Sequence, residues 1–238
     1  MIYLTGDTHI PIDIDKLSRK SFPEQKQLTR DDFIIVLGEF GLLWREDKTY
    51  HYWLDILSAK RYTLLFVDGN HENFDWLNSL PVESWHGGRV HRVAENILHL
   101  MRGEVFEIGG NTFFTLGGAI SHDRIYRTEG ISWWPQEVPS KVEIDHAIDT
   151  LACHRNQVDY VLTHTCPLDA LPEIRLRANT WDEYANHSIE KALQAINDTI
   201  QYKDWYFGHW HMDFDHNQYH AMYNRVLRLK QQFTAFET

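Results

Sequence analysis

Short apolar runs that each end in a glycine-containing turn are the feature of this 238-residue sequence that most constrains its fold. The first three runs occupy residues 1–6, 33–37 and 62–67, and their β-rich composition predicts buried strands. The segments between them, 12–30 and 48–60, are longer and amphipathic and predict helices. This alternation of strand and helix predicts a layered α/β fold.

The rest of the chain continues the pattern with shorter elements. Closely spaced strands are expected at 89–92, 97–101, 104–108 and 112–117, and this spacing predicts an antiparallel portion. Helices are then expected at 140–154 and 184–200, strands at 158–163 and 203–207, and hairpin-like segments near 211–229. Segment 119–139 has no clear period and predicts a long loop of the kind that is often functional. Because no repeat or linker interrupts the sequence, we expect a single domain spanning 1–238.

Residues able to bind metals follow five of the predicted strands directly. The five clusters are Gly6-Asp7-Thr8-His9, Gly38-Glu39-Phe40-Gly41, Gly69-Asn70-His71-Glu72, Thr163-His164 and Gly208-His209-Trp210-His211. Each cluster alone is explained as well by a turn, a cap or a hydrogen-bonded histidine, and His209 and His211 would share one side of a strand. Because ligands bind at the carboxyl edge of open α/β sheets, the joint occurrence of the clusters favours a metal site there.

The composition restricts the metal ligands and the partners. Only two cysteines are present, Cys153 and Cys166, which are too few for a disulfide framework or a thiolate zinc site. Any metal must therefore be bound through nitrogen and oxygen. The formal net charge of −11 disfavours nucleic acid as a partner and favours a small phosphorylated substrate. Because the sequence shows no secretory signal and no long apolar run, we expect a cytoplasmic protein without a membrane partner.

The ordered clusters resemble the signature of the calcineurin-like metallophosphoesterase superfamily. That signature consists of Gly-Asp-x-His, Gly-Asp, Gly-Asn-His-Glu/Asp, a lone His and Gly-His-x-His, and the resemblance runs from residue 6 to residue 211. It implies a four-layer αββα sandwich in which two mixed β-sheets are flanked by helices. It also implies two divalent transition-metal ions, with Mn²⁺ favoured and Fe, Ni, Co or Zn as alternatives.

The resemblance also implies a role for each residue of the clusters. Asp7, His9 and His211 would bind the first metal ion, Asn70, His164 and His209 would bind the second, and Glu39 would bridge both. His71 would not be a ligand and would act on the substrate as a general acid or a charge stabiliser. The implied reaction is hydrolysis of a phosphomonoester or phosphodiester by a hydroxide that the two ions activate.

Two features depart from the family pattern. Position 39 is Glu where the superfamily has Asp, and the extra methylene moves the carboxylate by roughly 1.5 Å. Glu39 either bridges after adjustment or binds one ion only, and we expect the second, so that Glu39→Asp would raise activity. The segment 40–42 also lacks the second Asp with which the family often orients its catalytic histidine, and Asp68 and Glu72 are candidates to replace it.

These departures leave a second function open, namely a catalytically weak or inactive module that uses the fold as a binding or scaffold surface. The side chains of the loop predicted at 119–139 give little information about the substrate. Its Arg124 and Arg127 are candidates to contact a phosphate, although loop arginines are more often solvated. We expect its Trp133 and Trp134 to form a loop core rather than to stack on a base.

Overall fold

The computed structural model describes residues 1–178 and 186–229 of the chain. One sheet contains β1 (Ile2–Thr5), β2 (Phe33–Leu37), β3 (Thr63–Val67), β4 (Val82–Trp85), β5 (Gly88–Ala94), β6 (Ile97–Leu100) and β13 (Leu227–Arg228). The other contains β7 (Glu104–Ile108), β8 (Asn111–Leu116), β9 (Tyr160–Thr163), β10 (Asp204–Phe207), β11 (Phe214–His216) and β12 (Tyr219–Ala221). The strand orders are β13-β1-β2-β3-β6-β5-β4 and β11-β12-β10-β9-β8-β7.

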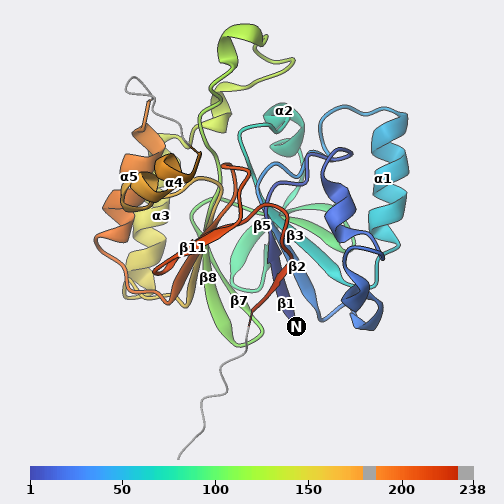
Figure 1. The fold of residues 1–238 in the computed structure, drawn as a ribbon, viewed down its shortest axis with the longest axis horizontal. Helices are drawn as coiled ribbons and strands as arrows, with labels where there is room; N and C mark the ends of the chain where they lie inside the picture. Colours follow the sequence, from blue (N-terminus) through green and yellow to red (C-terminus); the bar gives the residue numbers. More distant parts are fainter. Residues whose placement is uncertain (179–185, 230–238) are drawn as a thin grey trace, which may run out of the picture.

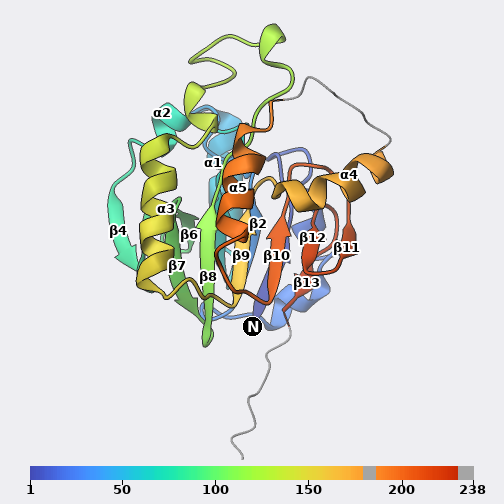
Figure 2. The ribbon, with the colours of Figure 1, turned by 90° about the vertical axis from the view of Figure 1, so that its left-hand side faces the viewer.

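The helices cover the outer faces of the two sheets. The α-helices are α1 (Lys48–Ser58), α2 (Phe74–Leu77), α3 (Lys141–Cys153), α4 (Leu171–Ala178) and α5 (Ser188–Asn197). The 3-10 helices are η1 (Ile14–Leu17), η2 (Pro23–Gln27), η3 (Arg124–Tyr126), η4 (Pro135–Glu137) and η5 (Leu168–Ala170). In Figures 1 and 2, α1 lies on one side of the paired sheets and α3, α4 and α5 lie on the other. The result is the four-layer α/β arrangement of two mixed sheets that the sequence predicted.

Parallel strands form the centre of each sheet. In the first sheet β1, β2, β3 and β6 run parallel, and in the second β8, β9, β10 and β12 do so. The predicted antiparallel portion is divided between the sheets, since β5 pairs with β6 and β7 pairs with β8. The carboxyl ends of the central strands therefore meet at one edge, which is uppermost in Figure 1.

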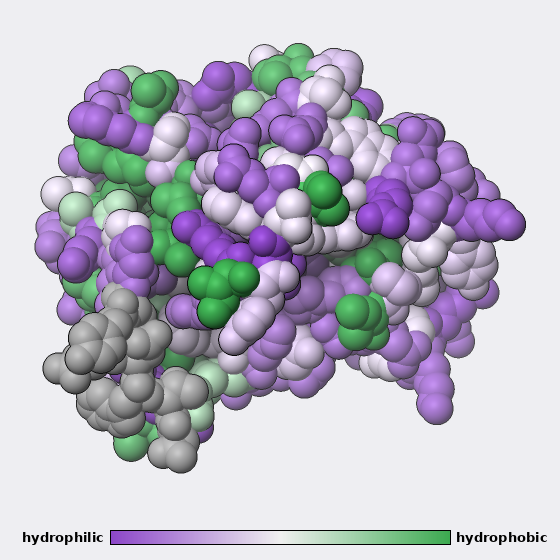
Figure 3. All heavy atoms as spheres, turned by 90° about the horizontal axis from the view of Figure 1, so that it is seen from above, coloured by the Kyte–Doolittle hydropathy of each residue, from purple (hydrophilic) through white to green (hydrophobic). Residues whose placement is uncertain are grey.

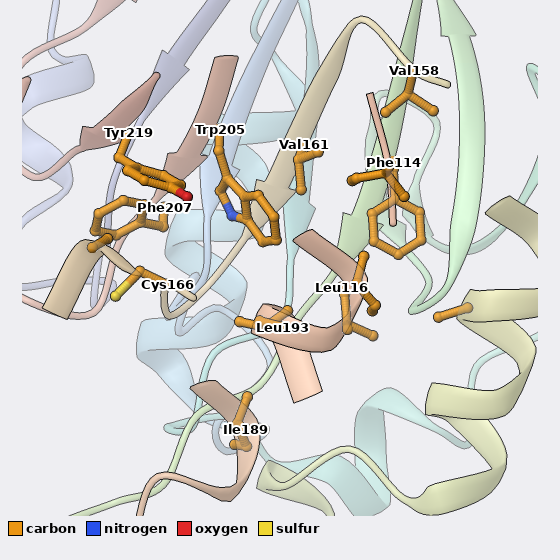
Figure 4. Packing of buried hydrophobic residues seen from close by; sticks show 14 of the residues in the cluster. Phe114, Leu116, Val158, Val161, Cys166, Ile189, Leu193, Trp205, Phe207 and Tyr219 are labelled. Atoms are coloured by element: carbon orange, nitrogen blue, oxygen red, sulfur yellow. The ribbon is translucent and has the colours of Figure 1, made fainter. Parts of the chain in front are cut away.

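Apolar side chains fill the three spaces between the four layers. Leu4 and Leu37 of the first sheet meet Leu162 of the second in the middle space. On the outer side of the second sheet, Trp205 and the neighbouring strand residues face Leu193 of α5, as Figure 4 shows. These buried contacts hold the strand ends in fixed positions relative to one another.

The predicted helix at 12–30 is wrong, because the segment contains only the short helices η1 and η2. Pro23 disfavours helical dihedrals at Phe22, which has φ −129° and ψ 75°, and Ser18 is extended. The side chain of Gln25 replaces helical hydrogen bonds by donating to the carbonyl oxygens of Leu17, Ser18 and Phe22 at 3.0, 2.8 and 2.8 Å. The segment therefore packs against one face of the first sheet, where Leu17 and Phe22 join the same core cluster as Ile34 of β2.

The other helix predictions agree more closely. Helix α1 covers most of 48–60, α3 covers most of 140–154, and α5 lies within 184–200, of which residues 184 and 185 are outside the described part. The sequence did not predict α2, α4 or β4, which are short or weakly patterned. Among the described residues, no helix combines the length and apolar character needed to span a membrane.

The predicted loop at 119–139 rises from the edge where the strands end, as both ribbon views show. It contains η3 and η4, and its base is held by the buried side chain of Glu137. Glu137 accepts hydrogen bonds from the backbone N–H and hydroxyl of Ser121 at 3.0 and 2.6 Å and pairs with Arg124. These contacts fix residue 121 and its neighbours above the strand ends.

Candidate metal centre

The strand ends bring metal-competent side chains from both sheets together. The first sheet supplies Asp7 and His9 after β1, Glu39 after β2, and Asn70 and His71 after β3. The second supplies His164 after β9 and His209 and His211 after β10. Seven of these residues form three groups, and within each group the donor atoms lie within 4.8 Å of one another. The groups are His9, Glu39 and His71; Glu39, His164 and His209; and Asp7, Glu39 and His211.

Glu39 lies at the centre, because its carboxylate belongs to all three groups. Its Oε2 contacts His9 Nε2 and lies 3.6 Å from His211 Nε2. Its Oε1 lies 3.2 Å from His71 Nδ1 and 3.8 Å from His164 Nε2. The two oxygens thus face two different sets of imidazoles, as a carboxylate between two cations would. This arrangement favours bridging by Glu39 over the expectation that it reaches one ion only, and metal titration tests that expectation.

Four residues of the site share an unusual backbone conformation. His9, Glu39, His209 and His211 all adopt positive φ, at 36°, 47°, 67° and 47°, a region that non-glycine residues rarely occupy outside strained or functional segments. At Gly69, an added Cβ would lie 2.4 Å from the backbone N and 2.5 Å from Cγ of Glu39, so only glycine allows this close approach between the two strand ends.

His209 and His211 follow the strand predicted at 203–207 and do not share one side of a strand, which was the alternative explanation. Strand β10 ends at Phe207, and both histidines belong to the turn that follows it. The backbone N–H of His209 points back to the Asp7 carboxylate, with distances of 3.1 and 3.0 Å to its two oxygens. The turn therefore directs His209 toward His164 and directs His211 toward Asp7, where His211 Nε2 lies 3.3 Å from Asp7 Oδ2.

Neighbouring groups fix the orientation of two imidazoles. His9 Nδ1 lies 2.7 Å from Asp13 Oδ2, and His164 Nδ1 lies 2.8 Å from the carbonyl oxygen of Leu37. When Nδ1 donates a hydrogen bond to oxygen, the Nε2 lone pair of a neutral imidazole is left to face the site. An oxygen partner on the other ring nitrogen is the usual arrangement for a metal-binding histidine.

Asn70 and His164 form a second indication of a cation. Asn70 Nδ2 donates to Ser121 Oγ at 3.0 Å, which turns Asn70 Oδ1 toward His164 Nε2 at 3.0 Å. When the His164 ring is protonated, its Nε2 donates to Asn70 Oδ1, and once that proton is lost the two atoms can bind one cation together.

The charges of the site are mutually dependent. Burial alone would raise the pKa of Glu39, but the imidazoles of His164, His211 and His9 hold it well below its usual value. Burial lowers the pKa of His9 and His164, yet Glu39 and Asp7 outweigh this and raise the two values to about 8 and about 9. For His209, burial and the nearby His164 hold the pKa well below its usual value. In the metal-free chain, protonated histidines thus balance the buried carboxylates.

The residues fit divalent metal ions. Asp7 and Glu39 are 0% and 2% exposed, and their ion-pair partners in the described part of the chain are histidines rather than lysines or arginines. Two buried carboxylates surrounded by imidazoles and one amide oxygen make a nitrogen and oxygen donor set suited to first-row transition metals. The absence of thiolates from this set agrees with the sequence analysis.

Four further residues contact the site, and sequence reasoning did not identify them. Asp13 lies four residues after His9 but is reached through an irregular turn. Ser121, His122 and Asp123 come from the loop above the strand ends. Ser121 contacts Asn70, the ring of His122 lies 6.1 Å from the ring of His209, and Asp123 Oδ1 lies 3.9 Å from His71 Nε2. Nothing in the spacing of these three residues indicates the contacts, which depend on the path of the loop.

Neither candidate for orienting His71 contacts it. Asp68 is buried between Arg102, at 2.6 Å, and His99, at 3.1 Å. Glu72 Oε1 accepts a hydrogen bond from the backbone N–H of Phe40 at 2.8 Å. Both acidic side chains therefore have structural roles.

The loop side chains named in the sequence analysis also have structural contacts. Arg124 pairs with Glu137 and packs over the Trp133 ring at 4.9 Å, while Arg127 pairs with Asp123 at 2.7 Å. Trp134 is buried in the core, as expected for a residue of a loop core. Neither arginine is simply solvated.

Comparison with known proteins agrees with this geometry. The family model described as calcineurin-like phosphoesterase matches residues 1–213, a range that contains all eight predicted site residues. No curated protein matches the chain.

Proposed function

This chain belongs to the calcineurin-like phosphoesterase family, and we propose that it hydrolyses a small phosphomonoester or phosphodiester with two divalent metal ions held around Glu39. Members of this family are metal-dependent phosphoester hydrolases, typically with two metal ions. The proposal extends that general activity to this chain and to the residues named above.

The position of Glu39 is the observation that carries the proposal. One carboxylate oxygen faces His9 and His211, and the other faces His164 and His71. With Asp7 beside His211, and with Asn70 and His209 beside His164, the side chains divide into two donor sets that share Glu39. Asp7, His9 and His211 would hold one ion, and Asn70, His164 and His209 the other. We favour Mn²⁺, with Fe, Ni, Co or Zn as alternatives.

The chain's own residues prepare the site for phosphoryl transfer. When bound, two such ions polarise the phosphoryl oxygens and activate a water molecule as the nucleophile. Asp13 and the carbonyl oxygen of Leu37 orient His9 and His164, and Ser121 orients Asn70. His71, whose Nδ1 lies 3.2 Å from Glu39, would act in its doubly protonated form: it would give one proton to the leaving oxygen and become the neutral imidazole.

Charge favours a small substrate. Two divalent ions and the carboxylates of Asp7 and Glu39 would leave the site with a charge of about +2, which one phosphate group can neutralise. The chain as a whole carries −11, which opposes the approach of a polyanion. The face seen from above the strand ends is mostly hydrophilic, with hydrophobic side chains in small separate groups, and this suits a polar substrate (Figure 3).

Hydrolysis of p-nitrophenyl phosphate and bis-p-nitrophenyl phosphate tests the proposal. We expect the chain to release p-nitrophenol from at least one of them when Mn²⁺ is added, and to lose this activity with a chelator. Glu39→Gln keeps the side-chain size but removes the central charge, so it should lose most of the turnover. Glu129→Gln changes an exposed loop carboxylate in the same way and serves as the matched control.

The same experiment separates the alternative function. A chain that binds two equivalents of Mn²⁺ and hydrolyses neither ester would be a binding or scaffold module, and the enzymatic proposal would be wrong. A chain that binds no metal would contradict both functions.

A further inference from the structure

His71 lies between two carboxylates. Its Nδ1 is 3.2 Å from Glu39 Oε1, and its Nε2 is 3.9 Å from Asp123 Oδ1. The first carboxylate belongs to the proposed metal centre. The second carboxylate, that of Asp123, comes from the loop at 119–139, which is distant in the sequence from the strand end that supplies His71. The turn after Glu39 contains Leu42 and Leu43, which are buried in the core. This turn therefore supplies no carboxylate to His71.

Asp123 is itself held in place. Arg127 Nε donates to Asp123 Oδ1 at 2.7 Å, and Arg127 Nη1 donates to the carbonyl oxygen of Ser132 at 2.9 Å. The backbone carbonyl of Asp123 accepts from the N–H of Tyr126 at 2.9 Å, which closes the turn of η3. Two sets of contacts thus fix this carboxylate, although its side chain is 47% exposed.

The contacts of the preceding residues place the turn against the site. Ser121 holds Asn70 at 3.0 Å, and the ring of His122 lies over the ring of His209 with 25° between their planes. Three consecutive loop residues, 121–123, therefore each contact one of the residues predicted from the strand-end clusters. The turn formed by residues 121–123 therefore lines the site.

From this geometry we propose that Asp123, braced by Arg127, is a positioning residue that holds the His71 ring with Nδ1 facing the proposed metal centre. The inference rests on the proposed phosphoesterase function, because it assumes that His71 acts on the leaving group. A separation of 3.9 Å is an ion-pair contact and is too long for a hydrogen bond. Asp123 therefore acts through the orientation of His71 and does not touch the substrate.

Leaving-group dependence tests this role. Proton donation matters most when the leaving oxygen is basic, so we compare phenyl phosphate with p-nitrophenyl phosphate, whose leaving group is less basic. Asp123→Asn should lower kcat on phenyl phosphate by about 10-fold to 100-fold, which is less than the roughly 10²-fold to 10⁴-fold typical of general acid catalysis because the acid itself remains. The loss on p-nitrophenyl phosphate should be smaller, and metal content should not change. Glu129→Gln, the same chemical change at an exposed position of the loop, should leave both rates unchanged.

A double variant separates positioning from a general structural effect. In the His71→Ala background, Asp123→Asn should cause no further loss, because the ring that it positions is absent. Arg127→Gln should give a smaller loss than Asp123→Asn with the same leaving-group pattern. Equal losses on both esters, or losses of Asp123→Asn and His71→Ala that add, would overturn the role of Asp123 and leave the proposed function standing.

A spectroscopic measurement tests the interaction between His71 and Asp123 without requiring enzymatic turnover. In metal-free protein labelled with ¹⁵N in the histidine rings, the His71 resonances are those missing from His71→Ala. At one fixed pH, Asp123→Asn should shift the His71 Nε2 resonance, whereas Glu129→Gln should not. His220, which pairs with Asp204 and Asp215, is an internal control.

The spectroscopic result also distinguishes failure of the inference from failure of the function. An unchanged His71 resonance in Asp123→Asn would overturn the pairing. A shifted resonance in a chain that hydrolyses no phosphoester would show that the pair exists but would overturn both its catalytic role and the proposed function.

Discussion

The position of the Glu39 carboxylate depends on the surrounding residues as well as on the length of its side chain. Considered alone, its extra methylene displaces the carboxylate from the position of a shorter Asp. In the structure, each of its two carboxylate oxygens nevertheless lies near imidazoles of a different donor set. The longer side chain therefore still reaches both sets.

These contacts favour the opposite of the outcome expected from the sequence for Glu39→Asp. Because both Glu39 oxygens lie near imidazoles, the shorter side chain should withdraw from one donor set and weaken binding of the second metal ion by about tenfold or more, or about 1.4 kcal/mol. Turnover should fall with it. Titration calorimetry with Mn²⁺, together with the phosphoesterase assay, measures both effects. Tighter binding and faster turnover in Glu39→Asp would restore the earlier expectation.

His71→Ala separates catalysis from metal binding. His71 lies within reach of Glu39 and His9, so geometry alone allows it to be a ligand. If it is the general acid, turnover should fall by about 10²-fold to 10⁴-fold while two equivalents of metal remain bound. Elemental analysis of the purified variant provides the metal count. Loss of one ion in His71→Ala would make His71 a ligand.

At the scale of elements, Arg102 links the two sheets. It lies between β6 of the first sheet and β7 of the second, and it is buried. Its guanidinium binds Asp68 after β3 at 2.9 and 2.6 Å, the carbonyl oxygen of Gln136 at 2.8 Å and Glu143 of α3 at 3.2 Å. One side chain thus fixes the crossover against the strand end that carries Asn70.

Removing this cation should destabilise the fold strongly. Arg102→Met leaves the Asp68 charge buried with only His99 as a partner, and we expect a loss of about 3–5 kcal/mol in the free energy of unfolding. Lys141→Met breaks an exposed ion pair with Asp145 and should cost at most about 0.5 kcal/mol. Urea denaturation measures both variants. A loss for Arg102→Met as small as that for Lys141→Met would contradict the linking role.

The pH dependence of this difference has a defined sign. Burial would raise the pKa of Asp68, but Arg102 and His99 hold it below its usual value of 3.8. The stabilisation is therefore fully present above that value and is lost as the pH falls below it. The difference in the free energy of unfolding between the native chain and Arg102→Met should therefore become smaller at acidic pH.

Elements with strong local patterns were predictable from the sequence. Strands β2 and β3 are uninterrupted apolar runs, and the clusters after them were found because each strand end is marked by a glycine. The helix at 12–30 failed because Pro23 and the hydrogen bonds of Gln25 determine that segment. The contacts of Ser121 and Asp123 were not predictable, since they depend on the base of the loop held by Glu137.

At the scale of the whole molecule, the proposed centre joins distant parts of the chain. Its residues run from Asp7 to His211 and come from both sheets. Bound metal would therefore stabilise both sheets together, and we expect one unfolding transition that moves to higher temperature with added metal. Two separate transitions would contradict the single domain expected for residues 1–238.

The effect of metal on thermal stability should grow with pH. In the metal-free chain the pKa values of His9 and His164 are raised to about 8 and about 9, so their stabilising effect is present below pH 6.5 and is lost as the pH rises through these values. Metal binds the neutral imidazoles and must displace these protons. The increase in Tm on adding Mn²⁺ should therefore be larger at pH 8.5 than at pH 6.5. An equal or smaller increase at the higher pH would show that these histidines are not ligands.

Anomalous diffraction from a crystal of this chain grown with Mn²⁺ tests the central claim most directly, because it locates the ions without reference to a substrate. The account predicts two anomalous peaks with the Glu39 carboxylate between them, one beside Asp7, His9 and His211 and the other beside Asn70, His164 and His209. A single peak, or peaks that do not contact Glu39, would contradict it.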